Sequence, residues 1–173
     1  MTNTDSERDI ASHVDALLEP LALAVDAEYI GEPISQLAHA LQCAHWAEKK
    51  GAPEEVIVAC LFHDVGHLLD DSAPQMDGLG VLDHETLGGD FIRSYGLPER
   101  VAKLVEAHVS AKRYLCCRKP AYYARLSPAS KGTLEWQGGP MSDAEATAFE
   151  QDPDFRYFLA LRNWDELAKE PDA

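Results

Sequence analysis

Basic side chains are scarce in this sequence. Its 15 Lys and Arg residues are outnumbered by 30 Asp and Glu residues, giving a net charge of −15, and no block of basic residues occurs. Such a surface repels phosphate backbones and anionic headgroups, so the composition excludes a nucleic-acid binder and disfavours docking on a membrane. The same reasoning, applied to a small anionic ligand, would predict weak binding.

Long apolar segments are also lacking. No run of about 18 or more apolar residues occurs, so we expect no membrane-spanning helix. Residues 1–10 are polar and acidic without the apolar core of a secretory signal, and we expect them to form a loose segment. The four cysteines show no CxxC spacing, so we expect reduced thiols and a cytoplasmic protein, with Cys43 and Cys60 in the core.

The alternating pattern of β-strands is missing, and helical spacing takes its place. Over residues 33–50 apolar side chains recur every three or four positions; Gly51 ends this helix and Pro53 begins the next. Residues 96–99 repeat this helix-to-helix junction, residues 142–145 match a capping box, and a last helix is expected over 152–169. We therefore predict an all-α fold, one compact domain over residues 1–173 with seven or eight helices. The segments 70–83 and 137–140 are expected to be irregular.

Histidine and aspartate stand side by side in an apolar segment. His63 and Asp64 lie within residues 56–70, which we expect to form one helix. A buried charged pair needs a partner, because an isolated charge is costly to remove from water. His67 follows His63 by four residues and would share its helix face.

Other candidate ligands lie on other predicted helices. His39 precedes the pair, His84 begins a helix, His108 ends one, and Asp165 lies in the last. A single buried histidine is more often a core imidazole bound to a carbonyl. Together, however, four imidazoles and two carboxylates predict a metal centre. Without thiolate, these ligands suit iron, manganese or cobalt better than structural zinc.

The number of ligands favours two ions rather than one. Six protein ligands leave a single catalytic ion no room for substrate. If Asp64 bridges, one ion would be held by His39, His63, Asp64 and Asp165, and the other by Asp64, His84 and His108. The second ion would then keep an open face for chemistry.

These residues carry a resemblance. The order His39, His63-Asp64, Asp165 resembles the H…HD…D motif of the HD-domain superfamily, helical metal-dependent proteins that are mostly phosphohydrolases, and His84 and His108 resemble its dinuclear branch. A narrower resemblance, to the PhnZ-type phosphonate oxygenases, covers nearly the whole chain. It rests on the ordered blocks 29–32, 36–39, 63–67, 108–114, 133–141 and 161–165.

The narrower resemblance implies a reaction. It is the oxidative cleavage of a carbon–phosphorus bond by O2 and a mixed-valent Fe(II)/Fe(III) pair. The implied substrates are 1-hydroxyphosphonates with a 2-amino or a 2-trimethylammonio group, and the products are inorganic phosphate with glycine or glycine betaine. The sequence does not distinguish the two amines.

The resemblance also implies roles by position. The six metal ligands are those named above, Tyr29 caps the second iron when substrate is absent, and Glu32 meets the cationic end of the substrate. The residues implied to hold the phosphonate are His67, Lys112, Ser130, Thr133 and Arg162, with Gln137 a weaker candidate. Tyr29, Glu32 and His67 are the candidate catalytic residues.

Each of these residues has an ordinary interpretation as well. Tyr29 could be a core tyrosine, Glu32 an acid near a helix start, and Lys112 a solvated cation. Arg162 and Asp165, three residues apart, have the spacing of a surface ion pair. His13 and His45 match no motif and are interpreted as non-functional.

Two other functions remain open at this point. In an HD-type phosphohydrolase the same metals would activate water, and a degenerate HD domain would act as a regulatory module. Tyr29, Glu32 and the block around Gln137 favour the oxygenase, and the intact ligand set disfavours the module.

The net charge of −15 disfavours large anionic partners, but it does not exclude a small anionic ligand. Two irons would leave the site locally cationic even beside two carboxylates, and Lys112 and Arg162 would reinforce it. We therefore expect a small-molecule phosphonate partner, no nucleic acid, no membrane, and a monomer or small homo-oligomer.

Overall fold

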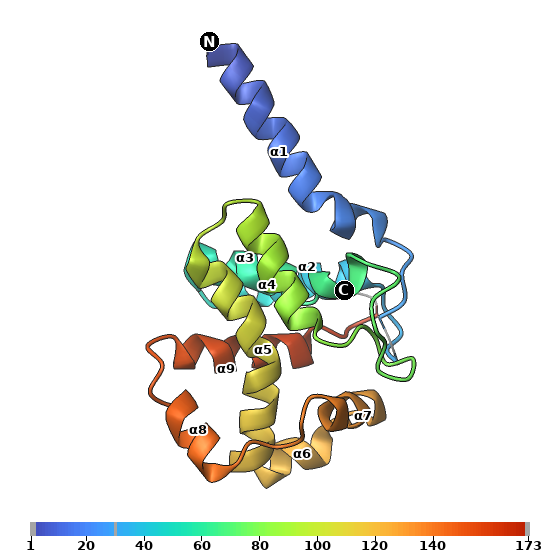
Figure 1. Ribbon diagram of the computed structural model, residues 1–173, viewed down its shortest axis with the longest axis vertical. Coiled ribbons are helices and arrows are strands. Elements are labelled where there is room, and N and C mark those ends of the chain that lie inside the picture. The colour runs from blue at the N-terminus through green and yellow to red at the C-terminus, as the bar shows by residue number, and fades with distance from the viewer. Residues whose placement is uncertain (1–2, 30, 172–173) are drawn as a thin grey trace.

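A computed structural model describes residues 3–29 and 31–171 (Figure 1). The helices are α1 (Asn3–Leu23), α2 (Gln36–Lys49), α3 (Glu54–Phe62), the 3-10 helix η1 (Val65–Leu68), α4 (His84–Ser94), α5 (Glu99–Arg118), α6 (Pro120–Arg125), α7 (Pro128–Trp136), α8 (Asp143–Phe149) and α9 (Phe155–Leu167). The all-α prediction is confirmed, and β-pairing in the described residues is limited to two isolated bridges. The described residues contain nine α-helices rather than the expected seven or eight, because α1 begins in a segment expected to be loose and α6 is too short to show a period.

Local sequence explains the helix boundaries. Ser35 caps α2 by accepting a hydrogen bond from the backbone N–H of Ala38 (3.2 Å), and Gly51 ends the turn after α2 with φ +69°. The predicted capping box at Ser142 and Glu145 is present at the start of α8. The expected irregular segment 70–83 is a loop between η1 and α4.

The segment around His63 differs from the expected single helix. The helix α3 ends at Phe62, and Asp64, at φ −103° and ψ 7°, leaves the helical conformation before η1 begins. Gly66 allows this break to pack tightly on α4, since a Cβ there would lie 1.9 Å from the carbonyl oxygen of His84. His67 therefore lies on a separate helix rather than on the face of His63.

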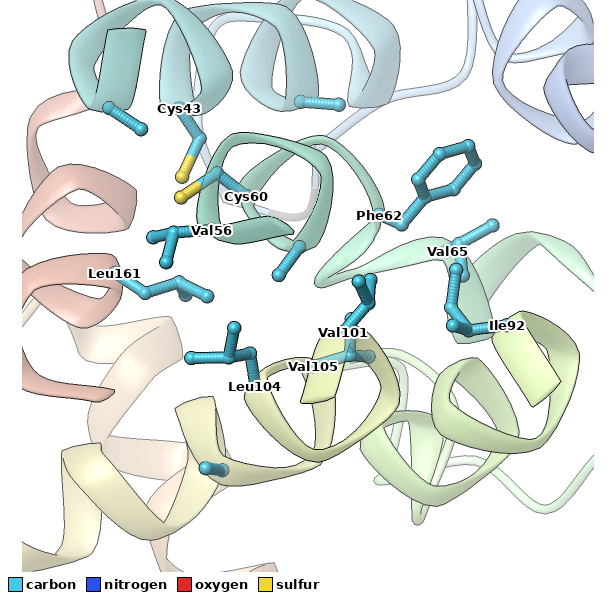
Figure 2. Close-up of a cluster of buried hydrophobic side chains, with 14 of the residues drawn as sticks. Cys43, Val56, Cys60, Phe62, Val65, Ile92, Val101, Leu104, Val105 and Leu161 are labelled. Atoms are coloured by element: carbon cyan, nitrogen blue, oxygen red, sulfur yellow. The ribbon is translucent and has the colours of Figure 1, made fainter. Parts of the chain in front are cut away.

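The core lies between α2, α3, α5 and α9 (Figure 2). Val56, Leu104 and Leu161 are fully buried there. Cys43 and Cys60 are buried as predicted, and Figure 2 shows their sulfur atoms pointing toward each other. A smaller apolar cluster joins the far half of α5 to α6, α7 and α8. The long helix α5 thus spans both clusters, and its middle carries His108, which we had placed at a helix end.

The N-terminal segment corrects one expectation. Residues 3–10, predicted to be loose, form the start of α1, which projects from the body in Figure 1. Residues 1–2 lie outside the described part of the chain, and the single domain over 1–173 stays a prediction. Among the described residues, every helix is too short or too polar to cross a membrane.

Candidate metal centre and substrate pocket

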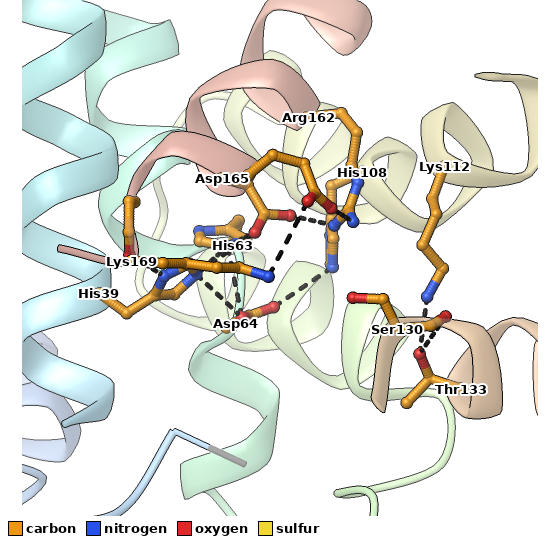
Figure 3. Close-up of polar contacts among 12 residues, drawn as sticks. His39, His63, Asp64, His108, Lys112, Ser130, Thr133, Arg162, Asp165 and Lys169 are labelled. Atoms are coloured by element: carbon orange, nitrogen blue, oxygen red, sulfur yellow. Dashed lines mark hydrogen bonds and ion pairs between the residues drawn. The ribbon is translucent and has the colours of Figure 1, made fainter. Parts of the chain in front are cut away.

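Three buried side chains from three elements form a first ligand group. His39 comes from α2, His63 directly follows α3, and Asp165 comes from α9. The Nε2 atoms of His39 and His63 lie 3.1 Å apart, and Asp165 Oδ1 lies 3.5 Å from His39 Nε2. Figure 3 shows the three side chains converging from different sides.

The hydrogen bonds of the two rings indicate that a cation belongs between them. His39 Nδ1 lies 2.7 Å from the carbonyl oxygen of Ala168, and His63 Nδ1 lies 2.8 Å from that of Cys60. A carbonyl only accepts, so each Nδ1 carries the proton and each neutral ring presents the Nε2 lone pair. Two lone pairs 3.1 Å apart repel each other unless a cation binds both. Asp165 Oδ1 is buried and has no hydrogen-bond donor among the described residues.

A second group repeats this arrangement. His84 and His108 place their Nε2 atoms 3.0 Å apart, and their Nδ1 atoms face the carbonyl oxygens of Val81 (3.3 Å) and Val105 (2.6 Å). Two nitrogen ligands about 2.1 Å from one ion, at adjacent octahedral corners, are about 3 Å apart. The spacing in both groups therefore fits a bound metal ion.

Asp64 joins the two groups. Its Oδ2 lies 3.5 Å from His39 Nε2 and 3.3 Å from His63 Nε2. Its Oδ1 lies 3.6 Å from His84 Nε2 and 3.3 Å from His108 Nε2. One oxygen thus faces each group, which is the placement of a bridging carboxylate. The break in the chain after α3 produces this orientation.

The electrostatics favour the metal-binding forms of Asp165 and His84, and they favour a positive charge at His63. Burial raises the pKa of Asp165, but Arg162 and the histidines outweigh it and lower that pKa to about 2. Burial, with help from the neighbouring histidines, holds the pKa of His84 well below its ordinary value. The pKa of His63 rises to about 10 because Asp64 and Asp165 outweigh burial. Without a metal ion, His63 therefore holds a second proton at neutral pH, and a metal ion that binds its Nε2 displaces that proton.

A cavity of about 70 Å³ opens beside the second group. Its wall includes every residue that the resemblance assigns to substrate, from five different parts of the chain: Tyr29, Glu32, His67, Lys112, Ser130, Thr133, Arg162 and the weaker candidate Gln137. Asp64, His84, His108 and Asp165 also line it, whereas His39 and His63 lie behind them. The fold therefore brings the predicted ligands and the predicted substrate residues into one place.

One side of the cavity carries donors for an anion. Lys112, buried on α5, donates to the Thr133 hydroxyl at 2.8 Å, and burial together with Arg162 lowers its pKa to about 7. The backbone N–H of Val81 donates to His67 Nδ1 (3.0 Å), which leaves His67 Nε2–H as the free donor. Ser130 lies near the start of α7, where its hydroxyl meets that of Ser127 at 3.2 Å.

Arg162 is buried, so its pairing with Asp165 is no surface ion pair. It also pairs with Glu166 and donates to the Tyr122 hydroxyl at 2.7 Å. The pairing with Arg162 holds Asp165 in place, and the guanidinium of Arg162 adds positive charge to the cavity wall.

Another part of the cavity wall carries Tyr29 and Glu32. The Tyr29 ring stacks on His39, with centroids 3.9 Å apart and planes 15° apart. Burial raises the pKa of Tyr29 well above its ordinary value, and Asp165 and Asp64 add to this shift. Glu32 Oε1 lies 3.0 Å from Lys169 Nζ, so a cation of the protein already pairs with it.

Comparison with known proteins matches residues 36–144 to the HD domain. The chain belongs to the HD-domain family. The matched range contains five of the six candidate ligands and ends before Asp165. Relatives of this HD-domain chain include proteins named as phosphonate dioxygenases.

One relative is the [1-hydroxy-2-(trimethylamino)ethyl]phosphonate dioxygenase (glycine-betaine-forming) of Leisingera caerulea, 42% identical over 148 residues, 85% of this chain and 75% of the relative. Another is the hydroxymethylphosphonate dioxygenase of Gimesia maris, 41% identical over 143 residues, 82% of this chain and 71% of the relative. They confirm the narrower resemblance and place this HD-domain chain among the oxygenases of its family.

Among the residues that pair with side chains of the HD-domain site, Glu166, Lys169 and Tyr122 were not predicted from the sequence. Glu166, four residues after Arg162, could have been found from helical spacing. Lys169 lies beyond the end of α9, where helical spacing gives no direction, and Tyr122 lies in the short helix α6. His13 and His45, interpreted as non-functional, lie outside both ligand groups.

Proposed function

We propose that this protein is an O2-dependent oxygenase that cleaves the carbon–phosphorus bond of a 1-hydroxyphosphonate. The proposed substrate is 2-amino- or 2-(trimethylammonio)-1-hydroxyethylphosphonate, and the products are inorganic phosphate with glycine or glycine betaine. One observation carries the proposal: two ligand groups joined by Asp64 lie directly beside a cavity with donors for an anion. The names of the two relatives support the same chemistry.

The cofactor that suits this donor set is a pair of iron ions. Imidazole and carboxylate ligands without thiolate suit redox-active iron, and the six candidate ligands would hold the two ions. When bound, an Fe(II)/Fe(III) pair supplies the redox chemistry by which O2 oxidises the carbon that bears phosphorus. One substrate and one O2 balance as one phosphate and one carboxylate product, without an added reductant.

The residues on the anion side would bind and orient the phosphonate. The Lys112 ammonium, the hydroxyls of Ser130 and Thr133, and His67 Nε2–H are the available donors. Arg162 is engaged by Asp165 and Glu166, so its proposed contribution is charge and the position of Asp165.

Tyr29 is proposed to cap the second metal position until substrate enters. Without a bound metal ion it is a neutral phenol at neutral pH, because burial raises its pKa. Glu32 is proposed to receive the cationic end of the substrate.

The deciding experiment measures O2 uptake and phosphate release together. Iron-loaded protein is incubated with each amine form of the substrate, and we expect one phosphate released for each O2 consumed. The Asp64→Ala variant is the negative control. Phosphate release from p-nitrophenyl phosphate or nucleotides without O2 uptake would instead indicate the alternative, an HD-type phosphohydrolase.

A cytoplasmic location and a monomeric or small homo-oligomeric state remain part of the proposal. Gel filtration of the purified protein tests the second.

A further inference from the structure

Lys169 reaches into the part of the cavity where a cationic ligand would bind. It follows α9 by two residues, and its Nζ lies 3.0 Å from Glu32 Oε1 and 3.9 Å from Glu166 Oε2. The same ammonium lies 5.9 Å from the centroid of the Tyr29 ring. Its side chain is 17% exposed, as is that of Glu32, so water screens the pair only in part. Figure 3 shows Lys169 extending toward the metal ligands.

We infer that Lys169 sets the substrate specificity at the Glu32 end of the cavity, an inference that rests on the proposed function. Its ammonium occupies the place that a cationic group of the substrate would take. A phosphonate that carries an ammonium must displace Lys169 from Glu32, whereas a phosphonate without one leaves the pair intact.

The two features that attract an organic cation are a carboxylate and an aromatic face. Here Glu32 and Tyr29 provide both, and both already face Lys169. An incoming ammonium gains Glu32 only by breaking the existing pair, and it meets a like charge while it does so. Hydroxymethylphosphonate, which has no cationic group, avoids both penalties.

Glu166 makes the displacement possible. Its Oε2 lies 3.9 Å from Lys169 Nζ, so the ammonium can turn to a second carboxylate when Glu32 is taken. Glu166 is already paired with Arg162, which weakens this alternative. Binding of a cationic substrate is thus allowed but penalised.

The test compares three phosphonates on the iron-loaded protein and its Lys169→Met variant. They are hydroxymethylphosphonate and the 2-amino- and 2-(trimethylammonio)-1-hydroxyethylphosphonates. We expect the variant to lower KM for both cationic substrates by about threefold to tenfold, the effect of one partly buried ion pair, with kcat changed less. KM for hydroxymethylphosphonate should not fall.

Three further variants separate specificity from general disturbance. Lys169→Arg keeps the pair with Glu32 and should retain the native ratio of KM values among the three phosphonates. Lys103→Met removes a lysine that pairs with Asp152, 2.8 Å away and outside the cavity, and should change no KM. In a Glu32→Gln background, Lys169→Met should no longer favour the cationic substrates, because the partner of the lysine is gone.

Two results would overturn the inference: an equal change of KM for all three phosphonates, or a higher KM for the cationic ones. Anaerobic titration calorimetry of the same phosphonates keeps it separate from the proposed function. Tighter binding of only the cationic phosphonates to Lys169→Met, without O2 uptake, would support the role of Lys169 and refute the oxygenase. O2 uptake without any change in the affinity for cationic phosphonates relative to hydroxymethylphosphonate would support the oxygenase and refute the role of Lys169.

Discussion

At the scale of the residue, backbone carbonyls prepare the four histidines of the centre for metal. Each Nδ1 faces a carbonyl oxygen at 2.6 to 3.3 Å, so each Nε2 is left as a lone pair directed at the centre. Asp64 faces both ligand groups, so both would depend on it if it bridges two metal ions. Loss of Asp64 should therefore affect both metal positions, whereas loss of one histidine should affect only one of them.

Asp64→Ala should release both metal ions, whereas His108→Ala should spare the first group. Asp64 contacts all four histidines, but His108 belongs to the second group alone. Iron content per chain, measured by mass spectrometry after desalting, checks this. We expect near zero for the first variant and about one ion for the second. Equal iron content in the two variants would contradict the bridging role.

We expect Lys112 to give the proposed activity a pH dependence near neutrality. Its pKa is lowered to about 7 by burial first and by Arg162 next, opposed by Asp165, Cys116 and Asp64. The ammonium form, which is proposed to bind phosphonate, is present below pH 7 and is lost above it. We expect kcat/KM to fall as pH rises above about 7.

Lys112→Met should remove that alkaline decline. It should also raise KM at pH 6 by about tenfold to a hundredfold, the effect of one charged hydrogen bond. Steady-state O2 uptake over pH 5.5 to about 9 measures both. The Lys103→Met variant should keep the native profile. An unchanged profile in Lys112→Met would assign the titration to another group.

At the scale of the element, the candidate metal centre depends on a short break between helices. The end of α3 at Phe62 and the start of η1 at Val65 leave Asp64 free to place one oxygen toward each ligand group. The break packs against the first residue of α4 through Gly66. Backbone packing at this point therefore controls the position of His84.

Gly66→Ala should damage both stability and the second ligand group. The added Cβ would meet the His84 backbone at 1.9 Å, so the start of α4 must move, at an expected loss of about 1–3 kcal/mol of unfolding free energy. Urea unfolding and iron content measure the two effects, and about one ion per chain should remain. Gly88→Ala is the matched control, because its nearest contact is a Val105 side-chain atom at 3.0 Å. Equal losses of stability and iron in the two variants would contradict the proposed role of the close contact between Gly66 and the His84 backbone.

At the scale of the whole molecule, the acid excess and the cationic site coexist because they occupy different places. The net charge of −15 belongs to the chain as a whole, whereas Lys112 and Arg162 are buried beside the metal ligands. A large polyanion is repelled by the acidic surface as a whole, whereas a small phosphonate inside the cavity is attracted by the nearby positive charges.

Metal binding should also stabilise the whole fold. The ligands come from α2, α4, α5, α9 and the segment after α3, so bound ions would link five parts of the chain. With free metal at about a hundred times Kd, one site adds about 2.7 kcal/mol, or roughly 5–10 °C in Tm. Calorimetry before and after chelation measures this shift. Asp64→Ala should show no metal-dependent shift; a shift of native size in that variant would place the metal elsewhere.

Much of the fold and the centre followed from the sequence, because they depend on local chemistry. Helical spacing, the glycine at position 51 and the Ser142–Glu145 capping box determined the all-α class and several helix boundaries. The residue types His and Asp, at positions inside apolar segments, determined the ligand candidates. The blocks that resemble the phosphonate oxygenases gave the candidates for the cavity wall.

Tertiary structure alone decided how these residues meet. The break at Asp64 depends on the approach of α4, and a periodic apolar segment gives no sign of it. The burial of Arg162 and the pairing of Lys169 with Glu32 link positions that the chain brings together only by folding. The sequence itself determined which chemical groups are available; packing between distant elements decided which charges meet, because Coulomb energy depends on distance in space and not along the chain.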